Sequence, residues 1–115
     1  MTPVYDTDRQ KVIGELVSRI VQVASPLRVI LFGSSATGRA TGDSDVDLLI
    51  VEDQPFGPGR SRRAELTRLW TALAEIPIAK DLLLYSQAEY DHWATSLNHI
   101  IARAAREGTV MYERK

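Results

Sequence analysis

Cysteine is absent from this 115-residue sequence, and neither sign of charge is in clear excess. Without cysteine the chain has no disulfide bonds, no zinc–thiolate site and no thiol catalysis, which fits a reducing compartment. The 14 Lys and Arg residues against 15 Asp and Glu residues give a net charge of −1. Nothing in this balance indicates nonspecific binding to nucleic acid or to a membrane surface.

Long apolar runs are also lacking. No segment reaches the roughly 20 apolar residues of a membrane-spanning helix, and residues 1–10 are polar and acidic, unlike a signal peptide. We therefore expect a cytoplasmic protein with no membrane partner and no direct binding to nucleic acid.

The remaining composition is that of one ordinary globular domain. The sequence is 44% hydrophobic and 25% charged, which suffices for one core. Its length predicts a single domain over residues 1–115, and no repeat, low-complexity segment or linker divides it.

Two segments in the first two thirds of the chain have the apolar spacing of helices that cover a core. The first is expected to begin at a cap on Thr7 or Asp8 and to end before Pro26, because proline disfavours helical geometry in the residue before it. The second spans residues 61–76.

A third helix follows the capping-box spacing of Ser86 and Glu89 and continues to Gly108, a C-terminal cap. Trp70 and Trp93 lie within the apolar stripes of the second and third helices. We therefore expect both tryptophans in the core.

Short apolar runs rich in β-forming residues alternate with these helices and predict strands. They cover residues 27–32, 45–51 and 78–85, with a short fourth strand over residues 109–112.

Two carboxylates, Asp45 and Asp47, open the second strand. Alternate side chains of a strand share a face, with Cα atoms roughly 7 Å apart, so both can converge on one hard cation. Magnesium is usually held by one or two carboxylates together with substrate phosphates. The alternative is a pair of exposed aspartates on an edge strand, which the low frequency of aspartate in strands disfavours.

The turn before this pair, which begins at Gly33, suits a phosphate. Glycine lets the backbone approach a ligand closely. Ser34 and Ser35 supply hydroxyls and can cap a short helix over residues 36–39, whose free amides would attract an anion. A strand-to-helix turn that binds nothing explains the same residues, because Gly-Ser pairs are common in turns.

A third carboxylate, Asp81, lies in the third strand on the face that carries Leu83 and Tyr85. If this strand pairs with the second, Asp81 joins Asp45 and Asp47 in one cluster. Three bare carboxylates would repel and raise one another's pKa values, and two divalent cations would relieve the repulsion.

The pattern of Gly33-Ser34, ten residues, Asp45-x-Asp47 and the later Asp81 resembles the minimal nucleotidyltransferases of the DNA polymerase β-like superfamily. The resemblance implies an α/β fold of the α+β type, with a small mixed sheet of three or four strands flanked by helices. It implies transfer of a nucleoside monophosphate from a triphosphate, with release of pyrophosphate. Gly33 and Ser34 would hold the phosphates, Asp45 and Asp47 would bind two Mg²⁺ ions, and Asp81 would complete one metal site.

The turn departs from the family at two positions, where many members carry basic or larger side chains. Ser35 and Thr37 stand there in this sequence. We expect the nearby Arg39 to substitute for the missing basic side chain, and Ser35 to take part in nucleotide binding as well.

The acceptor is expected to be another protein, because one domain leaves little room for a separate acceptor-binding unit. Minimal nucleotidyltransferases of this size resemble antitoxins that adenylylate a HEPN ribonuclease toxin. A HEPN partner, a hetero-oligomer or homo-oligomer, and AMP transfer from ATP to a protein hydroxyl follow from that resemblance. Two alternatives are an antitoxin that neutralises its partner by contact alone and, less favoured, an enzyme that modifies a small molecule such as an antibiotic.

Overall fold

Four strands form one mixed sheet in the computed structural model, which describes residues 4–33, 45–96 and 99–114. The strands are β1 (Arg28–Phe32), β2 (Val46–Glu52), β3 (Lys80–Ser86) and β4 (Thr109–Glu113), in the spatial order β3-β2-β1-β4. β1 is antiparallel to β2 and β4, whereas β2 and β3 are parallel. The expected mixed sheet is therefore confirmed.

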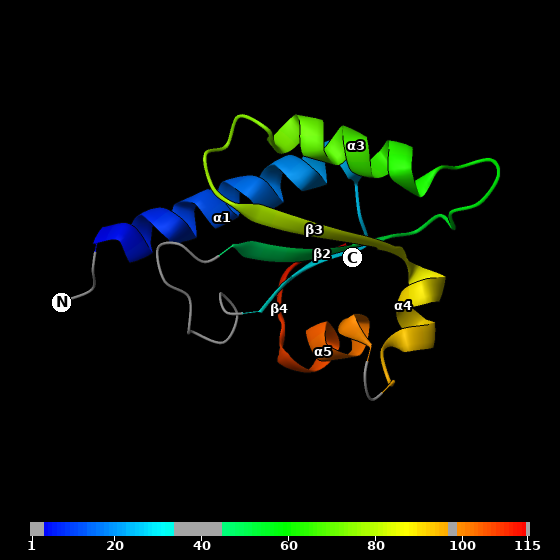
Figure 1. Ribbon diagram of the computed structural model, residues 1–115. Coiled ribbons are helices and arrows are strands. Elements are labelled where there is room, and N and C mark those ends of the chain that lie inside the picture. The colour runs from blue at the N-terminus through cyan, green and yellow to red at the C-terminus, as the bar shows by residue number, and fades with distance from the viewer. Residues whose placement is uncertain (1–3, 34–44, 97–98, 115) are drawn as a thin grey trace.

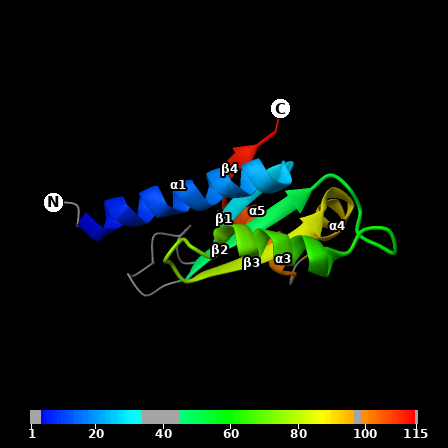
Figure 2. The ribbon, with the colours of Figure 1, turned by 90° about the horizontal axis from the view of Figure 1, so that it is seen from above.

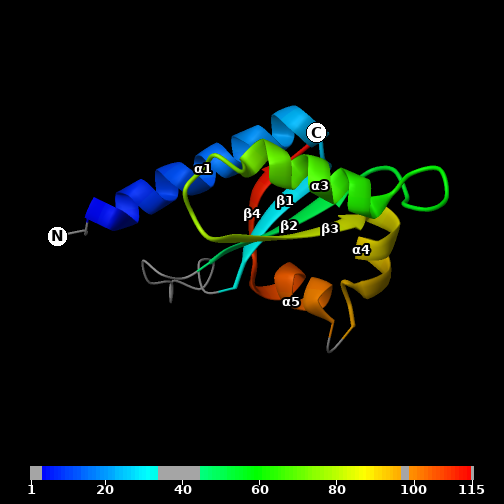
Figure 3. The ribbon, with the colours of Figure 1, turned by 45° about the horizontal axis from the view of Figure 1, so that its top comes forward.

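Helices cover both faces of the sheet. α1 (Val4–Ala24) and α3 (Arg62–Leu73) lie side by side on one face, while α4 (Gln87–Trp93) and α5 (Ile100–Glu107) lie on the other (Figures 1 and 2). Figure 3 shows the sheet between these two layers. Among the helices of the described residues, none combines the length and apolar character needed to cross a membrane.

β2 is buried on both faces because helices pack above and below it. Its residues alternate between the two cores: Val46, Leu48 and Ile50 belong to the cluster under α1 and α3, and Leu49 and Val51 to the cluster over α5. A near-continuous apolar run is typical of such a doubly covered strand.

Helix boundaries differ modestly from the sequence-based expectations. α1 begins at Val4, before the expected caps at Thr7 and Asp8, and ends at Ala24 before Pro26 as expected. Ser61 caps α3 by accepting a hydrogen bond from the Ala64 amide. α3 ends at Leu73, three residues earlier than the predicted end, because the chain then forms a short turn.

The predicted long C-terminal helix is two helices. The capping box of Ser86 and Glu89 starts α4 as predicted, but α4 ends at Trp93. His99 then caps α5, its Nδ1 accepting a hydrogen bond of 3.1 Å from the Ile101 amide. α4 has no fully buried residue, whereas α5 buries Ile101, Ala102 and Ala104, so one continuous buried stripe does not run through both helices.

Neither tryptophan is in the core, contrary to the sequence-based expectation. Trp70 is 36% exposed and faces the Lys80 ammonium, which lies 6.0 Å from its ring centre. Trp93 is 38% exposed and stacks on His99, with ring centres 4.4 Å apart. Both rings have a wide, partly polar surface that packs at the rim rather than inside.

One carboxylate, Glu52, is buried at the end of β2, where it is only 2% exposed. Its Oε1 pairs with the guanidinium of Arg60, while its Oε2 is buried without a hydrogen-bond partner. Burial first, and then the neighbouring Glu65 carboxyl, raises the pKa of Glu52 to about 7.

This buried carboxyl predicts a pH dependence of stability. The folded protein keeps the Glu52 proton up to about pH 7, whereas the unfolded chain releases it near the usual pKa of 4.5. The contribution of Glu52 to the free energy of unfolding is therefore fully present below pH 4.5 and is lost as the pH rises through 7. Glu52→Gln mimics the protonated form, so its free energy of unfolding should rise relative to wild type across this window and level off above it. Urea unfolding at pH 4.5 to 8.5 measures this difference.

Glu15→Gln is the matched control, because the Glu15 side chain is 55% exposed on α1 and loses little solvation on folding. A Glu52→Gln profile that runs parallel to wild type would show that folding does not raise the pKa of Glu52.

Candidate active site

Strand pairing brings two of the predicted aspartates together. Asp47 in β2 is the Cα partner of Asp81 in the parallel neighbour β3, and of Phe32 in the antiparallel neighbour β1. The three residues therefore form one row across the sheet, just where β1 ends. The second and third strands do pair, which was the condition for Asp81 to lie beside Asp47.

Both carboxylates lie on the sheet face that α4 and α5 cover. Asp47 shares this face with Leu49 and Val51, and Asp81 shares it with Leu83 and Tyr85, as the sequence predicted for the third strand. The sheet thus places the partly buried Asp47 beside an apolar core, with the exposed Asp81 next to it at the rim of that core.

Asp45 lies one residue before β2 and is exposed, so the strand starts later than predicted. Its backbone carbonyl accepts a hydrogen bond of 3.4 Å from Arg9 in α1. Asp45 is close enough to Asp47 to act on its charge, although Asp81 acts more strongly.

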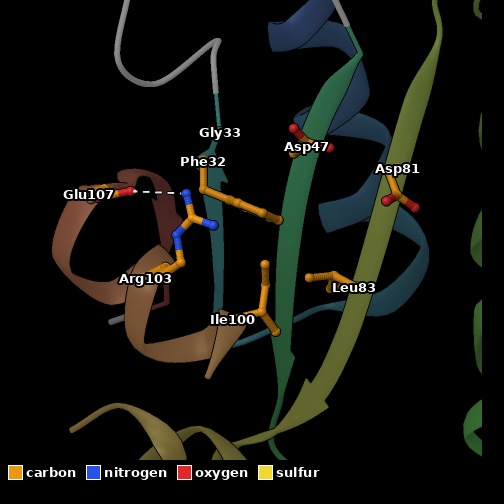
Figure 4. Close-up of a pocket in the computed structure, with 8 residues that line it drawn as sticks. All are labelled: Phe32, Gly33, Asp47, Asp81, Leu83, Ile100, Arg103 and Glu107. Atoms are coloured by element: carbon orange, nitrogen blue, oxygen red, sulfur yellow. Dashed lines mark ion pairs between the residues drawn. The ribbon is translucent and has the colours of Figure 1, made fainter. Parts of the chain in front are cut away.

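A cavity of about 470 Å³ opens beside this row. Its apolar wall is formed by Phe32, Leu83 and Ile100 (Figure 4). Its polar lining comes from two sides: the sheet contributes Gly33, Asp47 and Asp81, and α5 contributes Arg103 and Glu107. An apolar cleft with a few convergent charged groups is the usual form of a small-molecule site.

The carboxyl of Asp47 has a raised pKa. Burial is the largest cause, followed by repulsion from Asp81 and then from Asp45. A carboxylate in this position is costly to ionise, and a cation held between the acids would lower that cost.

The donor set fits a hard divalent cation only in part. Within residues 4–33, 45–96 and 99–114, no three His, Cys, Asp or Glu side chains converge enough to hold a metal by themselves. Two neighbouring carboxylates, Asp47 and Asp81, are nevertheless what magnesium needs when phosphates and water supply its other ligands. The residues therefore fit a cation that arrives with an anionic substrate.

Gly33 is required by the geometry of Asp47. Its φ angle is +73°, a conformation that favours glycine. A Cβ atom at this position would collide with Oδ2 of Asp47 and lie 3.3 Å from its Cγ. The structure thus gives Gly33 a steric role beside Asp47, and its predicted role in phosphate binding stays a prediction.

Three of the predicted nucleotide-binding residues, Ser34, Ser35 and Arg39, lie outside the described residues, as does the short helix expected over 36–39. Their role therefore stays a prediction.

The α5 lining was not predicted from the sequence. Ile100, Arg103 and Glu107 recur at intervals of three and four, so they share one side of the helix. This stripe lies beside the buried Ala104. The pattern was visible, but nothing in the sequence shows that it borders the carboxylates.

Substitution of Gly33 should disturb both the turn and Asp47. Gly33→Ala places a methyl group in a left-handed conformation and against a carboxylate, at a cost of roughly 1–3 kcal/mol. We expect a lower melting temperature and weaker nucleotide binding, measured by thermal unfolding and by titration with a nonhydrolysable triphosphate.

The control is Gly14→Ala in α1, where a Cβ atom would meet nothing within 4 Å. Alanine in a helix should raise stability by about 0.5–1 kcal/mol. Equal stability of Gly33→Ala and wild type would contradict the steric assignment.

The chain resembles known proteins in sequence and in fold. The family described as "Nucleotidyltransferase domain" matches residues 11–111. A candidate nucleotidyltransferase from Sulfolobus solfataricus shares 18% identity at a TM-score of 0.56, over 90% of this chain and 79% of that one. A toxin–antitoxin structure with AMP-PNP shares 15% identity at a TM-score of 0.52, over 89% of this chain and 74% of that one. At these identities the two structures show the fold alone, and no curated protein matches the chain. Because the family match spans most of the sequence, from α1 through β4, the chain belongs to the nucleotidyltransferase domain family.

Proposed function

We propose that this nucleotidyltransferase transfers AMP from ATP to a hydroxyl group of a protein acceptor. The observation that carries the proposal is the pair Asp47 and Asp81, at one register position beside a 470 Å³ cavity. A triphosphate with its cations fits this combination of acids, apolar wall and open space.

In this reaction the acceptor oxygen forms a bond to the α-phosphorus while the bond from that phosphorus to the bridging oxygen breaks. Pyrophosphate leaves with the electron pair. Asp47, with Asp45 and Asp81, would hold two Mg²⁺ ions. Their charge would stabilise the attacking and the leaving oxygen of such a displacement. Asp81 would also accept the proton of the attacking hydroxyl. The apolar wall of Phe32, Leu83 and Ile100 keeps water away from one side of the cavity.

The proposed acceptor is a HEPN-type ribonuclease toxin, with this protein as its antitoxin in the cytoplasm. Support comes from the toxin–antitoxin structure with AMP-PNP, which shares the fold. The two proteins would form a hetero-oligomer in which the toxin presents its hydroxyl to the cavity. The proposed nucleotide site is the one expected from the sequence: Gly33, with Ser34, Ser35 and Arg39 in the segment that follows it.

Asp47→Ala should lower AMP transfer to less than about one hundredth of wild type, because loss of a metal ligand costs more than the 10- to 100-fold of an outer-shell partner. Incubation of the HEPN partner with ATP and Mg²⁺, followed by intact mass spectrometry, measures the adenylyl adduct. Removal of Mg²⁺ with a chelator should have the same effect.

Asp53→Ala is the matched control, since Asp53 follows the opposite end of the same strand and is exposed. Full transfer by Asp47→Ala protein would exclude the proposed site. An Asp47→Ala protein that still neutralises the toxin, with no adduct in wild type either, would instead support an antitoxin that acts by contact.

A further inference from the structure

Arg103 stands opposite the aspartates in the cavity and has no part in the site predicted from the sequence. It projects from α5 beside Phe32, toward the end of β1 at Gly33 (Figure 4). Among the described residues that line the cavity, Arg103 is the one basic side chain. The cavity therefore has acids on β2 and β3, and the ion pair of Arg103 and Glu107 on the helix side.

The guanidinium is loosely held. Its Nη2 lies 3.9 Å from Oε2 of Glu107, one turn along α5, and the two side chains are 59% and 47% exposed. An exposed i, i+4 pair of this kind contributes little. Arg103 can therefore leave Glu107 and bind a more highly charged anion at a small cost in free energy.

A triphosphate in this cavity needs positive charge beyond its cations. Its phosphates would lie near Asp47 and Asp81, which repel them. Guanidinium groups bind phosphate oxygens through two parallel hydrogen bonds. Arg103 lies on the helix side of the cavity, across from both acids, where it can meet the distal end of the triphosphate.

We propose that Arg103 binds the β- and γ-phosphates of the nucleotide and stabilises the departing pyrophosphate. This assignment rests on the proposed nucleotidyl transfer. When the acceptor oxygen bonds to the α-phosphorus, the bridging oxygen takes the electron pair of the broken bond. Arg103 neutralises part of that charge and remains protonated throughout. It is thus the basic phosphate contact that the turn after Gly33 lacks at positions 35 and 37.

The experiment is titration of AMP-PNP and of AMP, with Mg²⁺, into wild type, Arg103→Ala and Arg106→Ala. Arg106 is the matched control, because it lies on the same helix, is exposed and does not line the cavity. We expect Arg103→Ala to bind AMP-PNP about tenfold or more weakly, since hydrogen bonds to charged groups are the stronger ones. AMP binding should change less than about twofold, and Arg103→Lys should restore part of the affinity.

Steady-state transfer to the HEPN partner shows whether Arg103 acts on the triphosphate, the nucleoside or the acceptor protein. Arg103→Ala should raise KM for ATP and lower kcat, whereas Arg106→Ala should match wild type. Unchanged AMP-PNP affinity in Arg103→Ala would overturn the inference. Equal losses of affinity for AMP-PNP and AMP would also overturn it, because Arg103 would then contact the part of the nucleotide that both share. Normal AMP-PNP affinity with poor transfer would overturn it too, because Arg103 would then contact the acceptor protein.

The proposed function and the role of Arg103 can fail separately. Loss of transfer in Asp47→Ala, with Arg103→Ala unaffected, would leave the function intact and exclude Arg103. Wild-type protein that binds no AMP-PNP would exclude both. Thermal unfolding of each variant checks that it is folded. The Arg103 side chain is more than half exposed, so its removal should not unfold the protein.

Discussion

The buried central strand β2 is the constraint on which the site depends. It is hydrogen-bonded on both sides and covered on both faces, so its register leaves no freedom. Asp47 is held in that register between Phe32 and Asp81, at the point where the apolar run begins. A shift of one residue would turn Asp47 toward α1 and α3 and would place Leu48 beside the cavity. The core that stabilises the fold therefore also aims the carboxylate.

The site stores unfavourable charge that a substrate can relieve. Burial and two neighbouring acids act against ionisation of Asp47, and Gly33 leaves just enough space for its side chain. Such local cost is common where a protein keeps groups ready for a ligand. Arg103 and Glu107 at the facing wall add a loose ion pair. Acids on one side and an exchangeable cation on the other suit a polyanion bound with divalent metal.

Prediction succeeded where local chemistry decides the outcome. The strands, the Ser86–Glu89 capping box and the end of α1 before Pro26 follow from backbone preferences of nearby residues. Prediction failed where a side chain could lie either in the core or at its rim. Trp93 fits an apolar stripe, yet it stacks on His99 at a break between two helices. Periodicity measures which side of a helix is apolar, but not how far that side extends under the sheet.

The sequence by itself determined the acids, the glycine and the alternation of helices with strands, because each depends on spacing along the chain. It also carried the resemblance to the nucleotidyltransferases. Only the tertiary structure decided that Asp81 pairs with Asp47, that Gly33 makes room for that carboxylate, and that Arg103 faces both acids across a cavity. These are contacts between segments far apart in the chain, and they exist only once the sheet has set its register and α5 has packed against it.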